Sequence, residues 1–396
     1  MFNALSAPKM IGRLIHKRLK SSLSRPTTVL VFPGQGVFSV EHLDFLSKRV
    51  HVEGVEELLE EADDALGFTI SRFVRDPKAN LGGYIESPIQ KTSIQQPLLL
   101  LTTKLLAKVI REEHGVDMFN DPVVKPHYLL GHSLGEIIAL VMQDVIDFRD
   151  GIKFCSQRGM LMEKCVASYY QVGDPQRVSE DQFKMFALVF PSQIFDHVLK
   201  FLRNQDQISL SNINNFQQIV ISGLESSCLV VVSRLKEHLA ELKLKARIRA
   251  IDLDVKVPFH NDILSPVKGG LDQMLQAYIG APILGNKIGY KPGEMKFPVV
   301  SNLDGCIQTY AEDQIRNIID VTSRPVNFLK CLQTIQELSE EVKYINFGSV
   351  TSGIISKFVS DKRSGVHAGS CTNIALDTEE GLKTIRKTIQ NASQST

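Results

Sequence analysis

Apolar residues from residue 27 onward fall into two kinds of pattern, short continuous runs and longer amphipathic stretches. Residues 28–32 form an apolar, partly β-branched run that ends in a Pro-Gly pair, which predicts a buried strand followed by a glycine-rich loop. Residues 127–130 predict a second strand of this kind. Helical periodicity, with a proline in the first turn of the second helix, marks residues 52–66, 97–113 and 136–142. Strands that alternate with helices predict an α/β fold with a parallel sheet covered on both faces.

The middle of the chain contains shorter elements in a different order. Strand-like runs alternate with two helical patterns over residues 184–190, 192–204, 218–222, 228–242 and 246–253. This β-α-β-α-β order over about ninety residues predicts a small α+β unit inserted into the larger domain. We place the unit at residues 165–255 and the large domain at residues 27–164 and 256–390. Two further stretches predict surface loops, the polar residues 168–182 and the glycine- and proline-rich residues 279–297.

The first forty residues have a composition of their own. They contain no aspartate or glutamate, and their basic residues are Lys9, Arg13, Lys17, Arg18, Lys20 and Arg25. Their apolar residues can gather on one side of a helix, with serines among them. An acid-free, basic, amphipathic segment is typical of a transit peptide, so residues 1–26 are predicted to direct the chain to the mitochondrial matrix and to be removed. The alternative is a basic helix that stays on the protein.

Composition narrows the class of protein further. The 45 basic and 44 acidic residues leave a net charge of +1, which argues against a nucleic-acid-binding protein. No uninterrupted apolar run is long enough to predict a membrane-spanning helix. The 6 cysteines show neither a C-x-x-C pair nor zinc-ligand spacing, so we expect free thiols and no metal site.

Residues 131–135 read Gly-His-Ser-Leu-Gly and match G-x-S-x-G between a predicted strand and a predicted helix. The pattern is typical of a sharp turn in which glycines on both sides of the serine remove side chains that would clash. The Ser133 hydroxyl is then exposed above the sheet, and the Leu134 N–H lies at a helix N-terminus, where negative charge is stabilised. Ser133 is therefore a candidate nucleophile, although a turn with an incidental serine is the alternative. We expect the adjacent His132 to be a packing residue.

A nucleophilic serine needs a base, and His260 is the candidate among the 10 histidines. It follows Val257-Pro258 at the end of an extended segment, because a residue before proline avoids the helical region. Loops presented by strands often carry catalytic groups. From the residues alone, His260 is either this base or a buried structural histidine.

Seven short segments occur in the same order as in one known family. They are residues 32–36, 96–97, 131–135, 157–160, 214–223, 257–260 and 325–326. With them the chain resembles the malonyl-CoA:acyl-carrier-protein transacylase family, the acyltransferases of fatty-acid synthesis. The predicted transit peptide makes it similar to the stand-alone mitochondrial members. The resemblance implies a hydrolase-like parallel-sheet domain with an inserted ferredoxin-like α+β subdomain.

The resemblance also implies roles for the matched residues. Ser133 matches the nucleophile that accepts the acyl group, and His260 matches the general base. The backbone N–H groups of Gln35 and Leu134 match the oxyanion hole. Arg158 matches the arginine that binds the free carboxylate of malonate. Without the resemblance, the local sequence indicates an exposed arginine on a helix.

Four other positions are implied with less defined roles. Gln96 and Asn214 match substrate-binding positions, the second on a loop. The Phe259 ring would crowd an α-methyl group and so favour malonyl over methylmalonyl. Many members have glutamine where this chain has Val321, and the backbone carbonyl of that residue steadies the histidine; valine supplies the same carbonyl.

The resemblance further implies the partners of the reaction. They are malonyl-CoA and acyl carrier protein, with coenzyme A entering only as a thioester substrate and with no metal or redox cofactor. We expect a monomer. A serine esterase or thioesterase with the same turn is the alternative enzyme; it needs an acid such as Asp320 or Asp304 and a late histidine such as His367. A non-catalytic scaffold is the third possibility, and it predicts a broken site.

Overall fold

The computed structural model describes residues 26–35, 40–78, 88–172, 182–278, 283, 285 and 287–393. Apart from Pro26, the predicted transit peptide lies outside these residues, as do parts of the two predicted loops. All six cysteines are free thiols, as expected from their spacing. Within the described ranges, no helix is both long and apolar enough to cross a membrane.

Six strands form the large sheet, in the order β10-β9-β2-β1-β11-β12. All neighbouring pairs are parallel except β10 with β9. The strands are β1 Thr27–Phe32, β2 Tyr128–Gly131, β9 Glu294–Val300, β10 Ile307–Tyr310, β11 Val342–Asn346 and β12 Cys371–Ala375. The predicted α/β fold with a parallel sheet is therefore confirmed.

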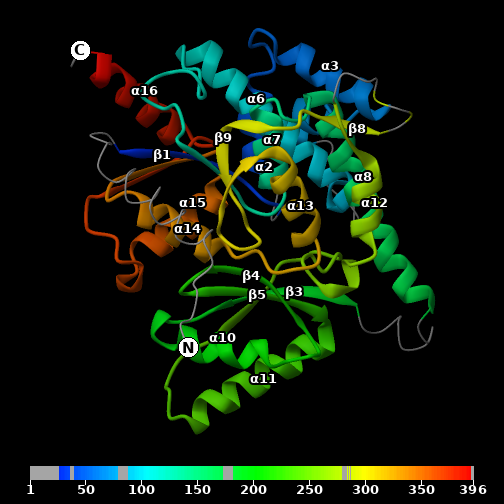
Figure 1. The fold of residues 1–396 in the computed structure, drawn as a ribbon, viewed down its shortest axis with the longest axis vertical. Coiled ribbons are helices and arrows are strands. Elements are labelled where there is room, and N and C mark those ends of the chain that lie inside the picture. The colour runs from blue at the N-terminus through cyan, green and yellow to red at the C-terminus, as the bar shows by residue number, and fades with distance from the viewer. Residues whose placement is uncertain are drawn as a thin grey trace, which may run out of the picture.

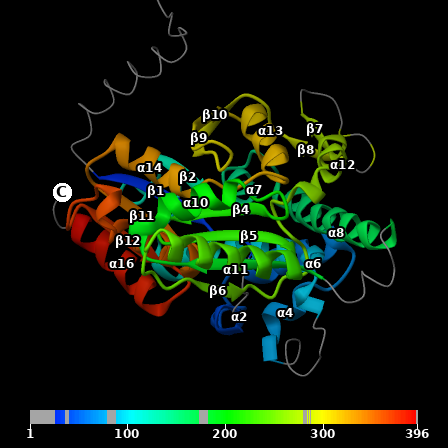
Figure 2. The same ribbon diagram turned by 90° about the horizontal axis from the view of Figure 1, so that it is seen from below.

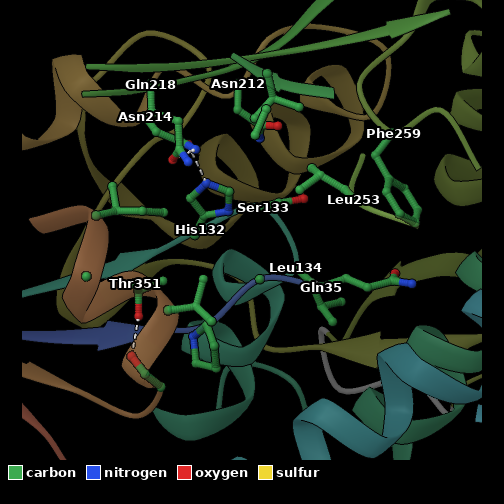
Figure 3. A pocket seen from close by; sticks show the side chains of 18 of the residues that line it. Gln35, His132, Ser133, Leu134, Asn212, Asn214, Gln218, Leu253, Phe259 and Thr351 are labelled. Atoms are coloured by element: carbon green, nitrogen blue, oxygen red, sulfur yellow. Dashed lines mark hydrogen bonds between the residues drawn. The ribbon is translucent and has the colours of Figure 1, made fainter. Parts of the chain in front are cut away.

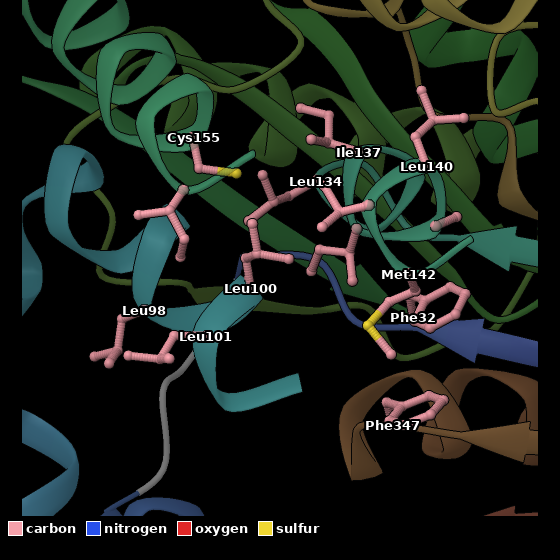
Figure 4. Close-up of a cluster of buried hydrophobic side chains, with 14 of the residues drawn as sticks. Phe32, Leu98, Leu100, Leu101, Leu134, Ile137, Leu140, Met142, Cys155 and Phe347 are labelled. Atoms are coloured by element: carbon pink, nitrogen blue, oxygen red, sulfur yellow. The ribbon is translucent and has the colours of Figure 1, made fainter. Parts of the chain in front are cut away.

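The central strand β1 is buried on both faces, which explains its continuous apolar sequence. Because side chains alternate along a strand, Leu30 and Phe32 enter one hydrophobic cluster and Val29 and Val31 enter the other. In the first cluster the Phe32 ring stacks on Phe347 with ring centroids 5.2 Å apart (Figure 4).

Helices cover both faces of this sheet (Figure 1). The first cluster contains residues of α2 Val40–Ser47, α3 Val55–Leu66, α4 Arg72–Arg75, α6 Thr92–His114, α7 Gly135–Met142, α8 Phe148–Val172, α12 Val267–Met274, α13 Ala311–Val321 and α16 Glu379–Ser393. The second contains residues of α14 Phe328–Leu338 and α15 Ser349–Val359. A short parallel pair, β7 Leu275–Ala277 and β8 Ile288–Tyr290, lies beside α8 and α12.

A second sheet of four strands, in the order β4-β5-β3-β6, forms the small subdomain (Figures 1 and 2). Its elements are β3 Phe183–Val189, α10 Phe195–Arg203, β4 Ser209–Asn215, β5 Gln218–Leu224, α11 Glu225–Glu241 and β6 Arg249–Asp252. This β-α-β-β-α-β order is ferredoxin-like, as the family resemblance implied. The residue pattern alone missed β4 because its sequence, Ser-Leu-Ser-Asn-Ile-Asn-Asn, is mostly polar.

Two predicted boundaries differ from the structure. Helix α6 begins at Thr92, so the proline at position 97 lies inside the helix and not in its first turn. The extra turn is stabilised because the Ser93 N–H and hydroxyl donate to the Glu163 carboxylate at 3.0 and 2.9 Å. Helix α8 continues to Val172 without a break, so the subdomain boundary placed after residue 164 falls inside a helix.

The predicted loop at 279–297 is also partly wrong, because it contains β8 and the start of β9. Strand β9 lies between β2 and β10 in the large sheet. The preceding Pro292-Gly293 and a proline inside the strand obscured its alternating pattern, in which Met295 and Phe297 are buried.

Candidate active site

The turn after β2 has the geometry of a nucleophile elbow. Ser133 has a left-handed backbone with φ of 52°. A Cβ atom on Gly131 would lie 2.1 Å from the Glu136 nitrogen, and one on Gly135 would lie 2.4 Å from the Phe32 carbonyl oxygen. Only glycine fits at these two positions, which is why the turn can place the Ser133 hydroxyl at the end of the strand.

The hydroxyl of Ser133 lies 2.7 Å from Nε2 of His260. The other ring nitrogen, Nδ1, lies 2.6 Å from the backbone carbonyl oxygen of Val321, at the end of α13. A carbonyl only accepts hydrogen bonds, so Nδ1 carries the proton and Nε2 is free to accept from the serine. The structure thus brings together a serine and a correctly oriented neutral base, with a backbone carbonyl where hydrolases have a carboxylate.

Burial sets the protonation state of this base. The His260 side chain is 3 % exposed, and desolvation lowers the pKa of His260 to about 3 against the opposing effect of the Val321 hydrogen bond. The positive charge of Arg158 lowers the pKa further. The imidazole is therefore unprotonated at neutral pH and can take a proton from the serine.

Two backbone N–H groups next to the serine have no acceptor in the part of the chain that the structure describes. They belong to Leu134, at the start of α7, and to Gln35, in the loop after β1. Both residues line the same cavity as Ser133. The side chain of Gln35 donates a hydrogen bond from Nε2 to Oε1 of Gln95 at 2.7 Å. Free N–H groups beside a nucleophile are suited to stabilise a developing oxyanion.

Arg158 is buried in the middle of α8 and also lines the cavity. Its Nη1 donates to Oε1 of Gln96 at 2.9 Å, while its Nε has no partner and no carboxylate of the described chain pairs with it. Burial lowers the pKa of Arg158 to about 10, so the side chain is still a cation at neutral pH. A buried cation without a counter-ion is unfavourable unless an anion binds beside it.

The position of Gln96 differs from the expectation that it binds substrate. Its amide is occupied by Arg158 and by the Met162 sulfur, and it does not line the cavity. Gln96 therefore holds the Arg158 guanidinium by a hydrogen bond without itself lining the cavity. The close crossing of α6 and α8 depends on Gly159, because a Cβ there would lie 2.5 Å from the Ser93 Cα.

The cavity between the two sheets has a volume of about 630 Å³. The large domain contributes the reactive groups Ser133, His260 and Arg158. The small subdomain contributes apolar side chains, Met185, Ala187, Val189, Val220 and Leu253, and also polar ones, Asn212, Asn214, Gln218 and Arg249 (Figure 3 labels the first three of the polar group). Phe259, which precedes the base in the chain, is 8 % exposed and lines this cavity. A reactive end and a long wall that mixes apolar and polar side chains suit an acyl thioester with an extended, partly polar arm.

Asn214 lies in strand β4 and not in a loop as expected, because β4 pairs with β5 along its length. Its Oδ1 lies 2.9 Å from Nε2 of His132, and its Nδ2 donates to Gln218 (Figure 3). The His132 ring also packs on Phe328, with ring centroids 5.0 Å apart. His132 is thus a packing residue, as expected, and in addition ties the elbow to the small sheet.

One residue that braces the elbow was not predicted. Asn302, just beyond β9, accepts a hydrogen bond from the Ser133 N–H at 2.7 Å and donates to the Gly131 carbonyl at 2.7 Å. One side-chain amide therefore holds both sides of the strained residue. The signal that could have found it is the polar Ser-Asn pair at the end of an apolar strand.

Asn302 is held in turn by the buried carboxyl group of Glu136. Glu136 Oε1 accepts from the Asn302 N–H and from Gln314 Nε2, each at 2.9 Å. Burial raises the pKa of Glu136 to about 7, although both hydrogen bonds lower it. In the sequence, the signal for a buried role of Glu136 was a charged residue in the otherwise apolar helix α7. This network lies behind the nucleophile and does not line the cavity.

The alternative hydrolase triad is not assembled. His367 is exposed and lies outside the cavity. Asp320 pairs with Lys268, and the Asp304 carboxylate accepts from the Cys306 N–H. None of these groups reaches the serine.

Comparison with known proteins gives a consistent picture. No family model matches the chain. Malonyl CoA-acyl carrier protein transacylase from Haemophilus influenzae is 26% identical over 338 residues, which cover 84% of this chain and 92% of that protein. The protein of the same name from Staphylococcus aureus is 28% identical over 337 residues, covering 84% and 93%.

Solved structures share the fold. Malonyl-CoA:acyl carrier protein transacylase from Helicobacter pylori has a TM-score of 0.69 and 18% identity, and the match covers 92% of this chain and 99% of that one. A type II PKS acyl-carrier protein in complex with its malonyl-transacylase matches with a TM-score of 0.67 and 24% identity, over 92% and 99%. In sequence and in fold the chain is thus similar to malonyl CoA-acyl carrier protein transacylases, an acyltransferase class of enzyme.

Proposed function

We propose that this protein transfers a malonyl group from malonyl-CoA to the phosphopantetheine thiol of an acyl carrier protein, through a malonyl-serine intermediate. The observation that carries the proposal is Arg158, a buried cation that forms no ion pair with a carboxylate of the described chain and lies in the same cavity as the Ser133–His260 pair. A guanidinium binds a carboxylate with charge-assisted hydrogen bonds, and malonyl is an acyl group that carries a free carboxylate. The names of the curated relatives support the same substrate.

In the first half-reaction Ser133 Oγ attacks the thioester carbon while His260 Nε2 takes its proton. The oxyanion of the tetrahedral intermediate accepts hydrogen bonds from the Gln35 and Leu134 N–H groups. When the intermediate collapses, the C–S bond breaks and the coenzyme A thiolate takes the proton from Nε2. Malonyl is then joined to Ser133 as an ester.

In the second half-reaction His260 takes the proton of the carrier-protein thiol, and the sulfur attacks the malonyl-serine ester. The C–O bond breaks, and Ser133 recovers its proton from Nε2. The imidazolium that forms in each step keeps its Nδ1–H on the Val321 carbonyl. These steps need only protein side chains and the two thiols, so we propose no metal or redox cofactor.

The Phe259 ring gives the proposed site a preference among malonyl groups. It lies beside the base and would crowd a methyl group on the α-carbon. One methyl group changes transition-state binding by about 1–3 kcal/mol, so methylmalonyl transfer should be slower but measurable.

Labelled malonyl-CoA tests the proposed function directly. With holo acyl carrier protein we expect label on the carrier, and without it label on the enzyme, because the proposed second nucleophile is the carrier thiol and not water. Label released as free malonate in both reactions would instead support the esterase. An enzyme that is never labelled would support the scaffold.

We further propose that the reaction serves fatty-acid synthesis in mitochondria. The acid-free, basic, amphipathic sequence of residues 1–26 supports this location. A chain without residues 1–25 should keep its activity in the test tube and remain in the cytosol of the cell. Fusion of residues 1–40 to a fluorescent protein is the matched control and should enter mitochondria; import of the truncated chain would contradict the proposal.

A further inference from the structure

Four basic residues alternate along the segment that leads into β6. Lys243, Lys245, Arg247 and Arg249, here called the basic stripe, are separated by single apolar residues. All four side chains are exposed, whereas Leu244, Ala246 and Ile248 between them pack on the core of the small subdomain. The alternation therefore places Lys245, Arg247 and Arg249 on one surface of the molecule, and Lys243 precedes them in the turn after α11, with a φ of 56°.

No charge of the described chain neutralises the basic stripe. None of its four residues forms an ion pair, and the acidic residues nearest in sequence are Glu241 before it and Asp252 and Asp254 after it. Asp252 is already paired with Lys184 at 2.8 Å. In a chain with a net charge of +1, four unpaired cations over seven residues are a strong local departure.

The stripe ends at the mouth of the active-site cavity. Arg249 pairs with Val189 across the strands β6 and β3, and both residues line the cavity. Strand β6 is the edge of the small sheet, with no strand on its outer side in the described chain (Figure 2). If extended, the segment from Lys245 to Arg249 spans roughly 13 Å, enough to contact more than one charged group of a partner.

We infer that the basic stripe is the docking surface for a negatively charged face of the carrier protein. The inference rests on the proposed function, which requires a carrier to deliver its phosphopantetheine arm into this cavity. An acidic partner seated on the stripe has its arm beside Arg249, at the cavity entrance. Complementary charge would accelerate the encounter and orient the carrier more than it would tighten the complex.

Basic residues on an edge strand have a second physical use, since they prevent two copies from pairing edge to edge. That use does not account for Lys243, Lys245 and Arg247, which precede the strand. It also predicts a different result, because loss of the charges would then cause self-association without an effect on carrier binding.

The double variant Lys245→Glu/Arg247→Glu tests the inference and leaves Arg249 in place. We expect the KM for holo acyl carrier protein to rise about 10-fold, and the salt dependence of the wild-type rate to be lost. Formation of malonyl-serine from malonyl-CoA, and transfer to free pantetheine, should stay within about 2-fold of wild type because neither step uses a carrier surface. The variant Lys245→Gln/Arg247→Gln introduces no acidic side chains, and it should raise the KM for holo acyl carrier protein by a smaller factor.

The matched control is Arg234→Glu/Lys236→Glu, which makes the same change in net charge. These exposed residues lie on α11, which packs on the face of the small sheet away from the cavity. An equal rise in KM with the control, or an unchanged KM with the stripe variants, would overturn the inference. So would a rise in the KM for malonyl-CoA alone, which would assign the stripe to coenzyme A phosphates, or self-association with normal carrier kinetics.

Direct titration of the enzyme with fluorescent carrier protein separates this inference from the proposed function. Binding that weakens in the stripe variants supports the docking surface even if no malonyl transfer is found. Malonyl transfer with stripe-independent binding would retain the function and reject the docking surface.

Discussion

Replacement of Ser133 with alanine should abolish the malonyl-enzyme and reduce malonyl transfer by at least about 10⁴-fold, as for other serine nucleophiles. The substitution removes Ser133 Oγ, the atom that lies 2.7 Å from His260 Nε2 and that would carry the malonyl group. The covalent route through malonyl-serine is then closed. Labelling with malonyl-CoA followed by peptide mapping measures the loss.

The Ser133→Ala variant should keep its fold. Alanine has the same Cβ as serine, and the left-handed backbone is held by Asn302 through main-chain atoms that the substitution leaves unchanged. We therefore expect the free energy of unfolding of the variant to stay within about 0.5 kcal/mol of the wild-type value. A variant that still acquires label at the normal rate would show that the nucleophile lies elsewhere.

Local sequence patterns predicted the parts of the site that depend on neighbours in the chain. The elbow follows from two glycines and a strand-to-helix change within five residues, and the structure has that turn. The predicted extended approach to His260 is wrong, because residues 256–257 form a bend, the Phe259 N–H donates to the Val257 carbonyl oxygen at 2.9 Å, and His260 itself has a left-handed φ of 60°. The central strand β1 follows from its continuous apolar run, because it is buried on both faces.

Parts of the site that depend on distant pairing could not be read in the same way. Asn302 is 169 residues away from Ser133 in the chain, and it reaches the elbow only because β9 lies beside β2 in the sheet. Strand β4 is stabilised by its pairing with β5 and carries few apolar side chains of its own. Neither neighbour is specified by local hydrophobicity.

Buried polar residues gave the largest difference between residue patterns and structure. Arg158 reads as an exposed helix residue, and only the family resemblance placed it in the site. It is 3 % exposed because Gly159 lets α8 approach the start of α6. Gln96 was assigned to the substrate by the same resemblance, yet its amide is occupied by the arginine.

Replacement of Arg158 with alanine should change the acyl preference of the enzyme. Malonyl and acetyl differ by one carboxylate, so discrimination requires a group that binds that charge. Loss of one or more charge-assisted hydrogen bonds, about 1.5–3 kcal/mol each, should reduce malonyl transfer by roughly 10- to 150-fold or more. Acetyl transfer should hold steady or rise, because a buried cation no longer opposes an apolar acyl group. The ratio of kcat/KM for malonyl-CoA and acetyl-CoA measures the change.

Arg149→Ala is the matched control, because Arg149 is an exposed arginine on the same helix and should leave both rates unchanged. Formation of acetyl-serine by the Arg158→Ala variant would show that the Ser133–His260 pair still works. An equal fall for both acyl donors would mean that Arg158 stabilises the fold through Gln96 and that another group binds the carboxylate. The guanidinium forms no ion pair within the described chain, which argues for the first outcome, since a purely structural arginine at this depth would be expected to have a carboxylate partner.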